Sequence, residues 1–268
     1  MKIGRIVIAG SILLFSAFFL CSSFLSAEGK AVGKVVIMEG SAKIIRQGKT
    51  IPATLLSRIY PDDTIITRGG ARMKILFVDG SVLTIGKRTK ISIEKFLYDK
   101  KEKKREVSFN LTLGKVRAVL GKASKDSLYE IKTPTAVAGA RGTDFIVWVV
   151  SRGVTYVLVL EGEIDVGDIG GLGSQILGKN FTLKVFQGKA PASAHRLTPE
   201  EMKKFLEGMK SGGEGFWKKW LEKFTWTSGS VTDEKPKQEE IINQPPPPAQ
   251  PLPGPPETPE GHTITIGD

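Results

Sequence analysis

Side chains able to carry out covalent or metal chemistry are scarce in this sequence of 268 residues. It contains two histidines, His195 and His262, and a single cysteine, Cys21. A Ser-His-Asp triad or a zinc site with several imidazole ligands needs histidines close to a nucleophile or to one another. Residues 32–189, which make up the centre of the chain, contain none. The sequence therefore favours a binding protein over an enzyme, and we expect no cofactor and no metal site.

Two patterns keep a catalytic alternative open. Residues 173–180 resemble a phosphate-binding loop, but Asn180 stands where a serine or threonine would hold magnesium. Strand-forming residues follow this segment, whereas the motif requires a helix N-terminus that directs amides at phosphate. A pair of distant carboxylates could serve as acid and base of a glycoside hydrolase, because such pairs lie far apart along a chain. A carbohydrate-active enzyme is the last of the alternatives.

The charge balance favours an anionic partner. The formal net charge is +11, and residues 100–105 form a basic run, Lys-Lys-Glu-Lys-Lys-Arg. We interpret this run as a solvated hairpin loop, and the alternative is a patch for an anionic polymer or lipid. Aromatic residues do not interleave with the run as a stacking site for nucleic acid would require. The expected partner is an envelope protein or an anionic polymer, and not nucleic acid.

The elements that position these residues are short strands. From 32 to 189 the chain alternates β-branched runs with glycine turns, and Asp79-Gly80 between two runs is typical of a hairpin. No helical pattern of 10–15 residues separates the runs, so we predict one all-β domain, a sandwich or a β-solenoid. Its core should bury the face containing Ile75, Phe77, Phe145, Val147 and Val159.

Residues 1–27 are typical of a secretory signal peptide. Lys2 and Arg5 precede an apolar run, and small residues end at Ala27. An uncleaved membrane anchor is the alternative, since residues 6–25 are long enough to span a bilayer. Either way we expect an exported protein of the periplasm or cell envelope, with membrane association through residues 1–25 in the second case.

The chain changes character after the β region. Residues 198–226 predict two short amphipathic helices, the first begun by Thr198 with Glu201 completing a capping box. Trp217, Trp220 and Phe224 form an apolar stripe on the second, which either packs on a sheet or places residues 214–226 in a membrane interface. Residues 231–268 are rich in proline and predict a disordered tail.

The β region resembles the FecR domain of bacterial envelope regulators over residues 33–188. The motif with the most detail is residues 131–145, where Thr133-Pro134 is followed by Arg141-Gly142-Thr143-Asp144. The other motifs, in the family's order, are Pro61 to Thr67, the hairpin at Asp79-Gly80-Ser81, Leu113 to Val116, and Val157 to Ile164. Proline removes an amide donor and ends a strand, and glycine frees the backbone at a corner. We expect Thr133, Pro134, Arg141, Gly142, Thr143 and Asp144 to form a structural or partner-contact motif, with Arg141 acting as a clamp on a carbonyl or carboxylate.

The resemblance implies a periplasmic interaction domain. In the named regulators this domain senses an outer-membrane receptor and informs a cytoplasmic sigma factor. Here only residues 1–5 precede the apolar run, too few for the cytoplasmic domain that those regulators carry. The sequence thus predicts a non-enzymatic binding or scaffold protein of the envelope. The first alternative is a membrane-anchored signal transducer related to sigma-factor regulators.

Overall fold

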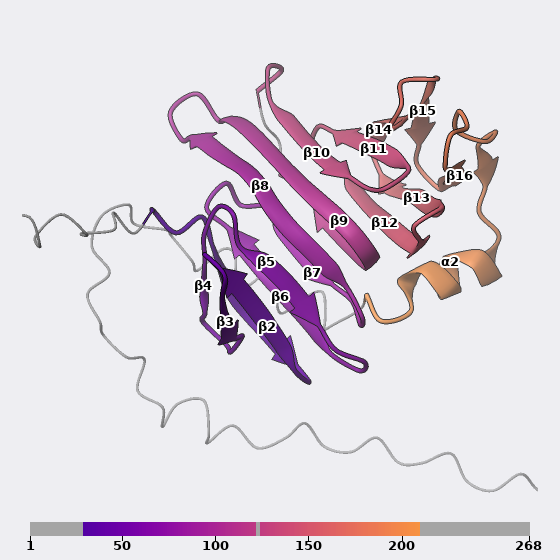
Figure 1. Ribbon diagram of the computed structural model, residues 1–268. Coiled ribbons are helices and arrows are strands. Elements are labelled where there is room, and N and C mark those ends of the chain that lie inside the picture. Colours follow the sequence, from indigo (N-terminus) through magenta and orange to yellow (C-terminus); the bar gives the residue numbers. More distant parts are fainter. Residues whose placement is uncertain (1–28, 122–123, 210–268) are drawn as a thin grey trace, which may run out of the picture. The chain divides into compact units, whose positions relative to one another are not determined.

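The described part of the chain forms two β-sheets and one helix (Figure 1). The computed structural model describes residues 29–121 and 124–209. Sheet A contains, in spatial order, β4 (Arg58–Ile59), β1 (Gly33–Glu39), β6 (Arg72–Phe77), β7 (Val82–Ile85), the second part of β9 (Lys104–Val119), β12 (Asp144–Ser151), β13 (Val154–Glu161), β16 (Phe181–Phe186) and β17 (His195–Arg196). Sheet B contains β3 (Lys49–Pro52), β2 (Ala42–Arg46), β5 (Thr64–Thr67), β8 (Lys90–Asp99), the first part of β9, β10 (Leu128–Lys132), β11 (Ala136–Ala140), β14 (Glu163–Asp168) and β15 (Ser174–Gly178). The prediction of a mainly β protein is confirmed.

The long strand β9 belongs to both sheets. Its residues 104–113 pair with β8 and those from 106 to 110 also pair in parallel with β10, whereas 114–119 pair with β12 and, from 116 on, with β7. The change occurs at Gly114, whose φ is +94°. A Cβ at Gly114 would lie 2.5 Å from the Cα of Thr89, so only glycine fits there. Before this point the odd-numbered residues of β9 face the core, as Phe109 and Leu111 do. After it the even-numbered residues do, as Val116 and Ala118 show.

One hydrophobic core lies between the two sheets. Aromatic rings cross it in sequence, with centroid distances of 5.5 Å from Phe77 to Phe109, 5.4 Å from Phe109 to Tyr129, and 6.5 Å from Tyr129 to Phe145. Phe77 and Phe145 come from sheet A and the other two from sheet B, so the rings join the layers. The predicted core face is confirmed, because none of its five side chains, Ile75, Phe77, Phe145, Val147 and Val159, is more than 2% exposed.

Helix α2 (Pro199–Leu206) covers part of the outer face of sheet A (Figure 1). It begins as predicted: the Thr198 side chain accepts a hydrogen bond from the Glu201 amide, and the Glu201 carboxylate accepts one from the Thr198 amide. Phe205 and Met209 pack on Ile146 of β12 and Leu158 of β13. The predicted signal or anchor at 1–27, the second predicted helix with its Trp217, Trp220 and Phe224 stripe, and the tail at 231–268 lie outside the described residues.

Within the described ranges, no helix combines the length and apolar composition needed to cross a bilayer.

Lys115 of β9 fastens α2 to the sheet. Its ammonium donates hydrogen bonds to the carbonyl oxygens of Lys204, Phe205 and Glu207, at 3.2, 3.0 and 2.9 Å. It also lies 4.8 Å from the ring centroid of Trp148. A cation at the C-terminal end of a helix complements the negative end of its dipole. Burial lowers the pKa of Lys115 to about 8, with Glu207 raising it and repulsion from Lys87 and Lys204 lowering it.

We expect Lys115→Met to loosen α2 at neutral pH, at a cost of about 1–2 kcal/mol, because three carbonyl oxygens at the end of the helix lose their hydrogen-bond donor. Hydrogen exchange of residues 199–206 should speed up, whereas Lys184→Met, which removes only a cation above the Tyr156 ring, should leave it unchanged. The unfolded lysine stays protonated up to its ordinary pKa of 10.5, while the folded one releases its proton near 8. From about pH 8 to 10.5 the wild-type chain should therefore gain stability relative to Lys115→Met. An unchanged exchange rate in α2 would contradict the role of Lys115.

Candidate functional site

The first half of the predicted motif forms a buried hydroxyl cluster. Thr133, just after β10, accepts a hydrogen bond from the Ala136 amide at 2.8 Å. Its hydroxyl lies 3.0 Å from that of Thr155 on β13, and the Thr135 hydroxyl donates to the Thr155 oxygen at 2.7 Å. All three threonines are buried. They shape the turn between β10 and β11 around Pro134 and connect sheet B to β13 of sheet A.

The second half of the motif points to two different places. Gly142 has a φ of +71° in the turn between β11 and β12, and this places Arg141 on the exposed side of that turn. Thr143 is buried, and its hydroxyl has no hydrogen-bond partner among the described residues. Asp144 lies on the outer face of sheet A and accepts two hydrogen bonds from Arg117, at 2.9 and 2.7 Å. The motif residues are therefore not gathered into one site.

The arginine clamp expected at Arg141 is formed by Arg117 instead. Arg117 lies directly across from Ile146 on the neighbouring strand, two residues along from Asp144, and its guanidinium meets the Asp144 carboxylate with two parallel hydrogen bonds. The guanidinium of Arg141 makes no hydrogen bond or ion pair with any residue in the described ranges. It is thus available to a ligand or partner.

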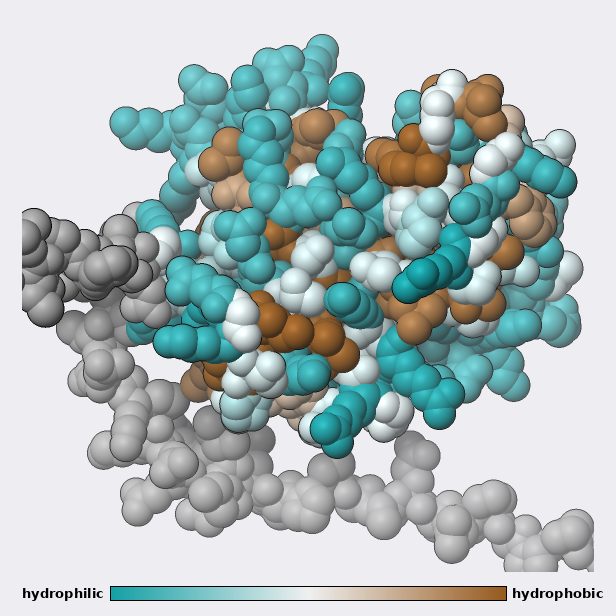
Figure 2. Space-filling model, in the orientation of Figure 1, coloured by the Kyte–Doolittle hydropathy of each residue, from teal (hydrophilic) through white to brown (hydrophobic). Residues whose placement is uncertain are grey.

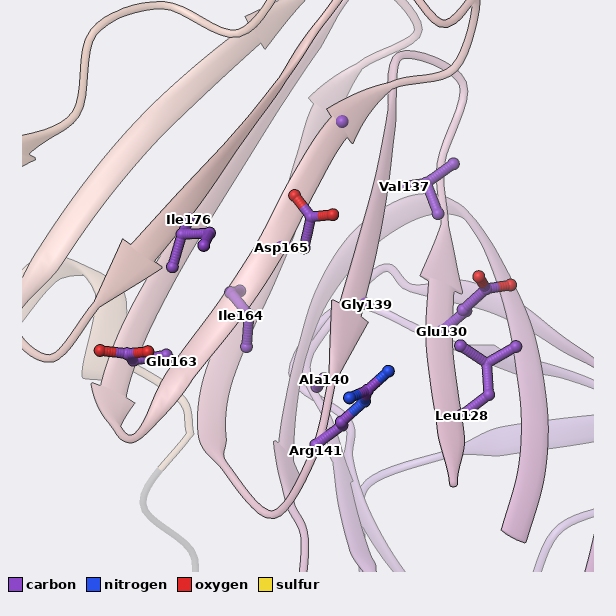
Figure 3. Close-up of a pocket in the computed structure, with 11 residues that line it drawn as sticks. Leu128, Glu130, Val137, Gly139, Ala140, Arg141, Glu163, Ile164, Asp165 and Ile176 are labelled. Atoms are coloured by element: carbon purple, nitrogen blue, oxygen red, sulfur yellow. The ribbon is translucent and has the colours of Figure 1, made fainter. Parts of the chain in front are cut away.

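Arg141 lines a groove on the outer face of sheet B. The groove encloses about 680 Å³ and crosses β10, β11, β14 and β15 (Figure 3). Its floor is low at Gly139 and Gly167, which have no side chain to fill the space above the sheet. Figure 3 shows one wall at Leu128, Glu130 and Val137, and the other at Glu163, Asp165 and Ile176, with Arg141 between them at one end.

The groove is acidic although the chain as a whole is basic. Its ionisable groups are Glu130, Glu163, Asp165 and Arg141, three carboxylates against one guanidinium. None of the four forms an ion pair with another residue in the part of the chain that the structure describes. Local charge of this kind attracts cationic groups of a partner.

The neighbouring acid on the same face differs from these three. Glu94 of β8 contacts Lys132 at 3.2 Å and accepts a hydrogen bond from Ser108 at 3.1 Å. Burial opposes the charge of Glu94, but the bonds from Lys132 and Ser108 outweigh that opposition and lower its pKa. The charge of Glu94 is thus compensated within the chain, whereas the carboxylates of the groove have no cationic partner among the described residues.

The groove presents charged and apolar groups that can contact a ligand or a partner. It contains no histidine or cysteine, and the described residues 29–121 and 124–209 include no cluster of three or more His, Cys, Asp or Glu side chains that would hold a metal ion. Sequence reasoning missed this site. The signal that was present is the alternation of Glu163 and Asp165 with buried Ile164 and Val166, which placed both acids on one exposed face.

The basic run at 100–105 is divided by the fold. Residues 100–104 are exposed around the turn between β8 and β9, in line with the predicted hairpin loop. Arg105 is buried and donates a hydrogen bond to Asp79 at 2.8 Å. The surface patch considered for an anionic polymer therefore lacks its arginine.

The middle of the chain matches a known protein family. Residues 63–165 match the model of the family described as FecR protein. The match runs from Asp63, before β5, to Asp165 on β14, a shorter range than the 33–188 over which the resemblance was expected. It includes Arg141 and most of the groove, and it ends before β15. No curated protein matches the sequence.

Solved structures with a similar course of the chain include two crystal structures of a candidate anti-sigma factor from Parabacteroides distasonis. They align with TM-scores of 0.44 and 0.43 at 15% and 16% identity, covering 54% of this chain in both cases. The aligned part is 64% and 65% of those chains, so this chain spans less than two thirds of their length. A structure described as a cell surface anchoring domain aligns over 23% of this chain and 83% of its own length, with 28% identity and a TM-score of 0.23.

Proposed function

Since this chain carries a FecR domain, we propose that it is a non-enzymatic regulator of the bacterial cell envelope that binds another protein through the groove of sheet B. The family match supports a signalling role, and so favours the signal transducer over the simple scaffold that the sequence first suggested. The finer expectations, a periplasmic location and retention in the membrane, belong to this proposal.

One observation carries the choice of surface. Glu130, Glu163 and Asp165 converge on a concave face, exposed or half-buried, without a cationic partner among the described residues. A folded protein gains little from gathering like charges, because they repel one another. Such a cluster does favour the approach and correct placement of a basic partner. Arg141 at the end of the groove adds a donor that can fix the orientation of a carboxylate or carbonyl.

Charge reversal in the groove tests this function. We expect the double substitution Glu163→Lys and Asp165→Lys to abolish any change in transcript levels that the wild-type chain produces when it is restored to cells lacking it. Both side chains are exposed, so the variant should reach the wild-type protein level. The double substitution Glu102→Lys and Asp126→Lys changes the net charge equally on exposed loops outside the groove, and it should retain the wild-type response.

The scaffold alternative predicts a different result. Cells lacking the chain would then lose envelope integrity, measured as sensitivity to detergent, without a specific change in transcripts. The regulator proposal would be wrong if the wild-type chain altered no transcripts, and the choice of surface would be wrong if both double variants behaved alike.

A further inference from the structure

Strand β15 is an open edge of sheet B. It pairs with β14 on one side, and no described strand lies on its other side. The three other sheet edges are blunted in ways that commonly prevent strand pairing. β3 carries Lys49 and Pro52, and β4 and β17 are two residues long. β15 has five residues, Ser-Gln-Ile-Leu-Gly, with neither a charge nor a proline.

The hydrogen-bonding phase of β15 leaves its outer edge available. The Asp168 amide donates a hydrogen bond to the Gly173 carbonyl at 3.1 Å. This pair continues the register of the two strands, in which Gly167 lies opposite Ser174. Hydrogen-bonded pairs alternate with non-bonded pairs in an antiparallel ladder, so Gln175 and Leu177 bond to β14. The amide and carbonyl groups of Ser174 and Ile176 point the other way, and no described residue bonds to them.

The surface beside this edge is apolar. Ile176 is 75% exposed, and Leu172 and Ile169 of the β14–β15 turn are 62% and 51% exposed. Figure 2 shows hydrophobic surface over the end of the molecule where this hairpin lies in Figure 1. An unpaired strand with exposed aliphatic side chains is typical of sites where an extended peptide adds to a sheet.

The acidic wall of the groove lies one strand further in. Glu163 is directly opposite Gly178 and Asp165 is directly opposite Ile176. Because Gly178 has no side chain, a long basic residue on an added strand could pass over it and reach Glu163. A residue opposite Ile176 would meet an aliphatic side chain instead. The edge thus distinguishes, by their chemistry, two positions of a bound strand that are two residues apart on the same face.

We propose that β15 binds an extended segment of a partner protein as an additional strand of sheet B. The segment carries an aliphatic residue opposite Ile176 and a lysine or arginine opposite Gly178, which pairs with Glu163. The inference rests on the proposed function in taking the partner to be a protein. A second copy of this chain fits less well, because pairing β15 with itself would bring Glu163 and Asp165 of both copies onto one continuous face, where they repel.

Peptide display on the full chain tests the proposal. Random nine-residue peptides selected on the wild-type chain should share an aliphatic residue and a basic residue two positions apart, because Ile176 and Gly178 are two residues apart on β15. Ile176→Pro should weaken their binding by about tenfold or more, since it removes an edge donor and adds a ring that blocks the approach of a strand. The same substitution leaves the ladder with β14 intact, because the Ile176 amide points away from it. Ile176→Thr, the matched control, keeps the amide and should change affinity by less than about threefold.

Glu163→Lys should change the selection from basic to acidic residues at one position of the peptide. Each variant should show the wild-type circular dichroism spectrum and unfolding midpoint. The proposal is wrong if no peptide is enriched, if Ile176→Pro binds the selected peptides as the wild-type chain does, or if this substitution abolishes self-association of the chain seen by sedimentation. Loss of binding with Glu163→Lys but not with Ile176→Pro would keep the groove as the binding site and exclude strand addition.

Discussion

Replacing Arg105 with methionine is expected to lower the free energy of unfolding by about 3–5 kcal/mol, because it leaves a buried carboxylate without its cation. The Arg105 and Asp79 side chains are 3% and 0% exposed. Arg105 also donates a hydrogen bond to the Gly121 carbonyl, and Asp79 accepts from the amide and hydroxyl of Ser81, at 3.0 and 2.6 Å. The pair thus ties the Asp79-Gly80 hairpin to the start of β9.

Urea unfolding followed by circular dichroism would measure this loss. Lys95→Met is the control, because Lys95 pairs with Glu106 on the surface, where both side chains are 46% exposed. Exposed pairs contribute less than about 1 kcal/mol, so the control should remain close to the wild type. Adding Asp79→Asn to Arg105→Met should restore part of the stability, since the unpaired charge is then removed. If Arg105→Met and Lys95→Met lowered the free energy of unfolding equally, the buried ion pair would contribute no more to stability than the exposed one.

Gly114→Ala is expected to destabilise the fold by about 3–4 kcal/mol, through left-handed backbone strain and overpacking together. The added methyl group would lie 2.3 Å from the Thr89 hydroxyl oxygen and 2.5 Å from its Cα. Thr89 cannot move away freely, because its amide donates to the Thr67 hydroxyl at 2.9 Å and its own hydroxyl oxygen accepts from the Lys115 amide at 3.1 Å. The clash therefore falls on the point where β9 passes between the sheets.

The thermal midpoint and urea midpoint of Gly114→Ala would be compared with those of Gly178→Ala. At Gly178 an added methyl group meets nothing within 4 Å, so this control isolates the general effect of exchanging glycine for alanine. Its stability should differ from the wild type by less than about 1 kcal/mol. If Gly114→Ala were as stable as Gly178→Ala, the bend in β9 would not depend on glycine.

The strands and the helix start were predictable because their determinants are local. Alternation along Met73, Ile75 and Phe77 fixes which face of β6 is buried, and Asp79-Gly80 fixes the turn that follows. The start of α2 follows from Thr198 and Glu201, three residues apart. None of these features requires knowledge of which strands are neighbours.

The ion pairs and the groove depend on that knowledge and could not be predicted. Asp79 and Arg105 are 26 residues apart in sequence, and Arg105 belongs to a run that otherwise is exposed. Likewise Arg141 and Arg117 are both arginines, so residue type does not show which of them binds a carboxylate. Only the register of β9 against β12 places Arg117 beside Asp144. The groove depends on β10, β11, β14 and β15 being neighbours in that order, although β12 and β13 separate β11 from β14 in the sequence.

The double membership of β9 has a consequence for a chain that emerges with its N-terminus first. Until residues 104–119 follow, β8 has no partner beyond β5, and β7 has none beyond β6. Both layers then present open edges of the kind that pair with foreign chains. The arrival of β9 covers both edges at once, and β9 then presents the edges to which β10 and β12 add. A chain halted before residue 104 therefore exposes open edges on two strands of different layers, whereas one halted just after residue 119 exposes both on the same strand.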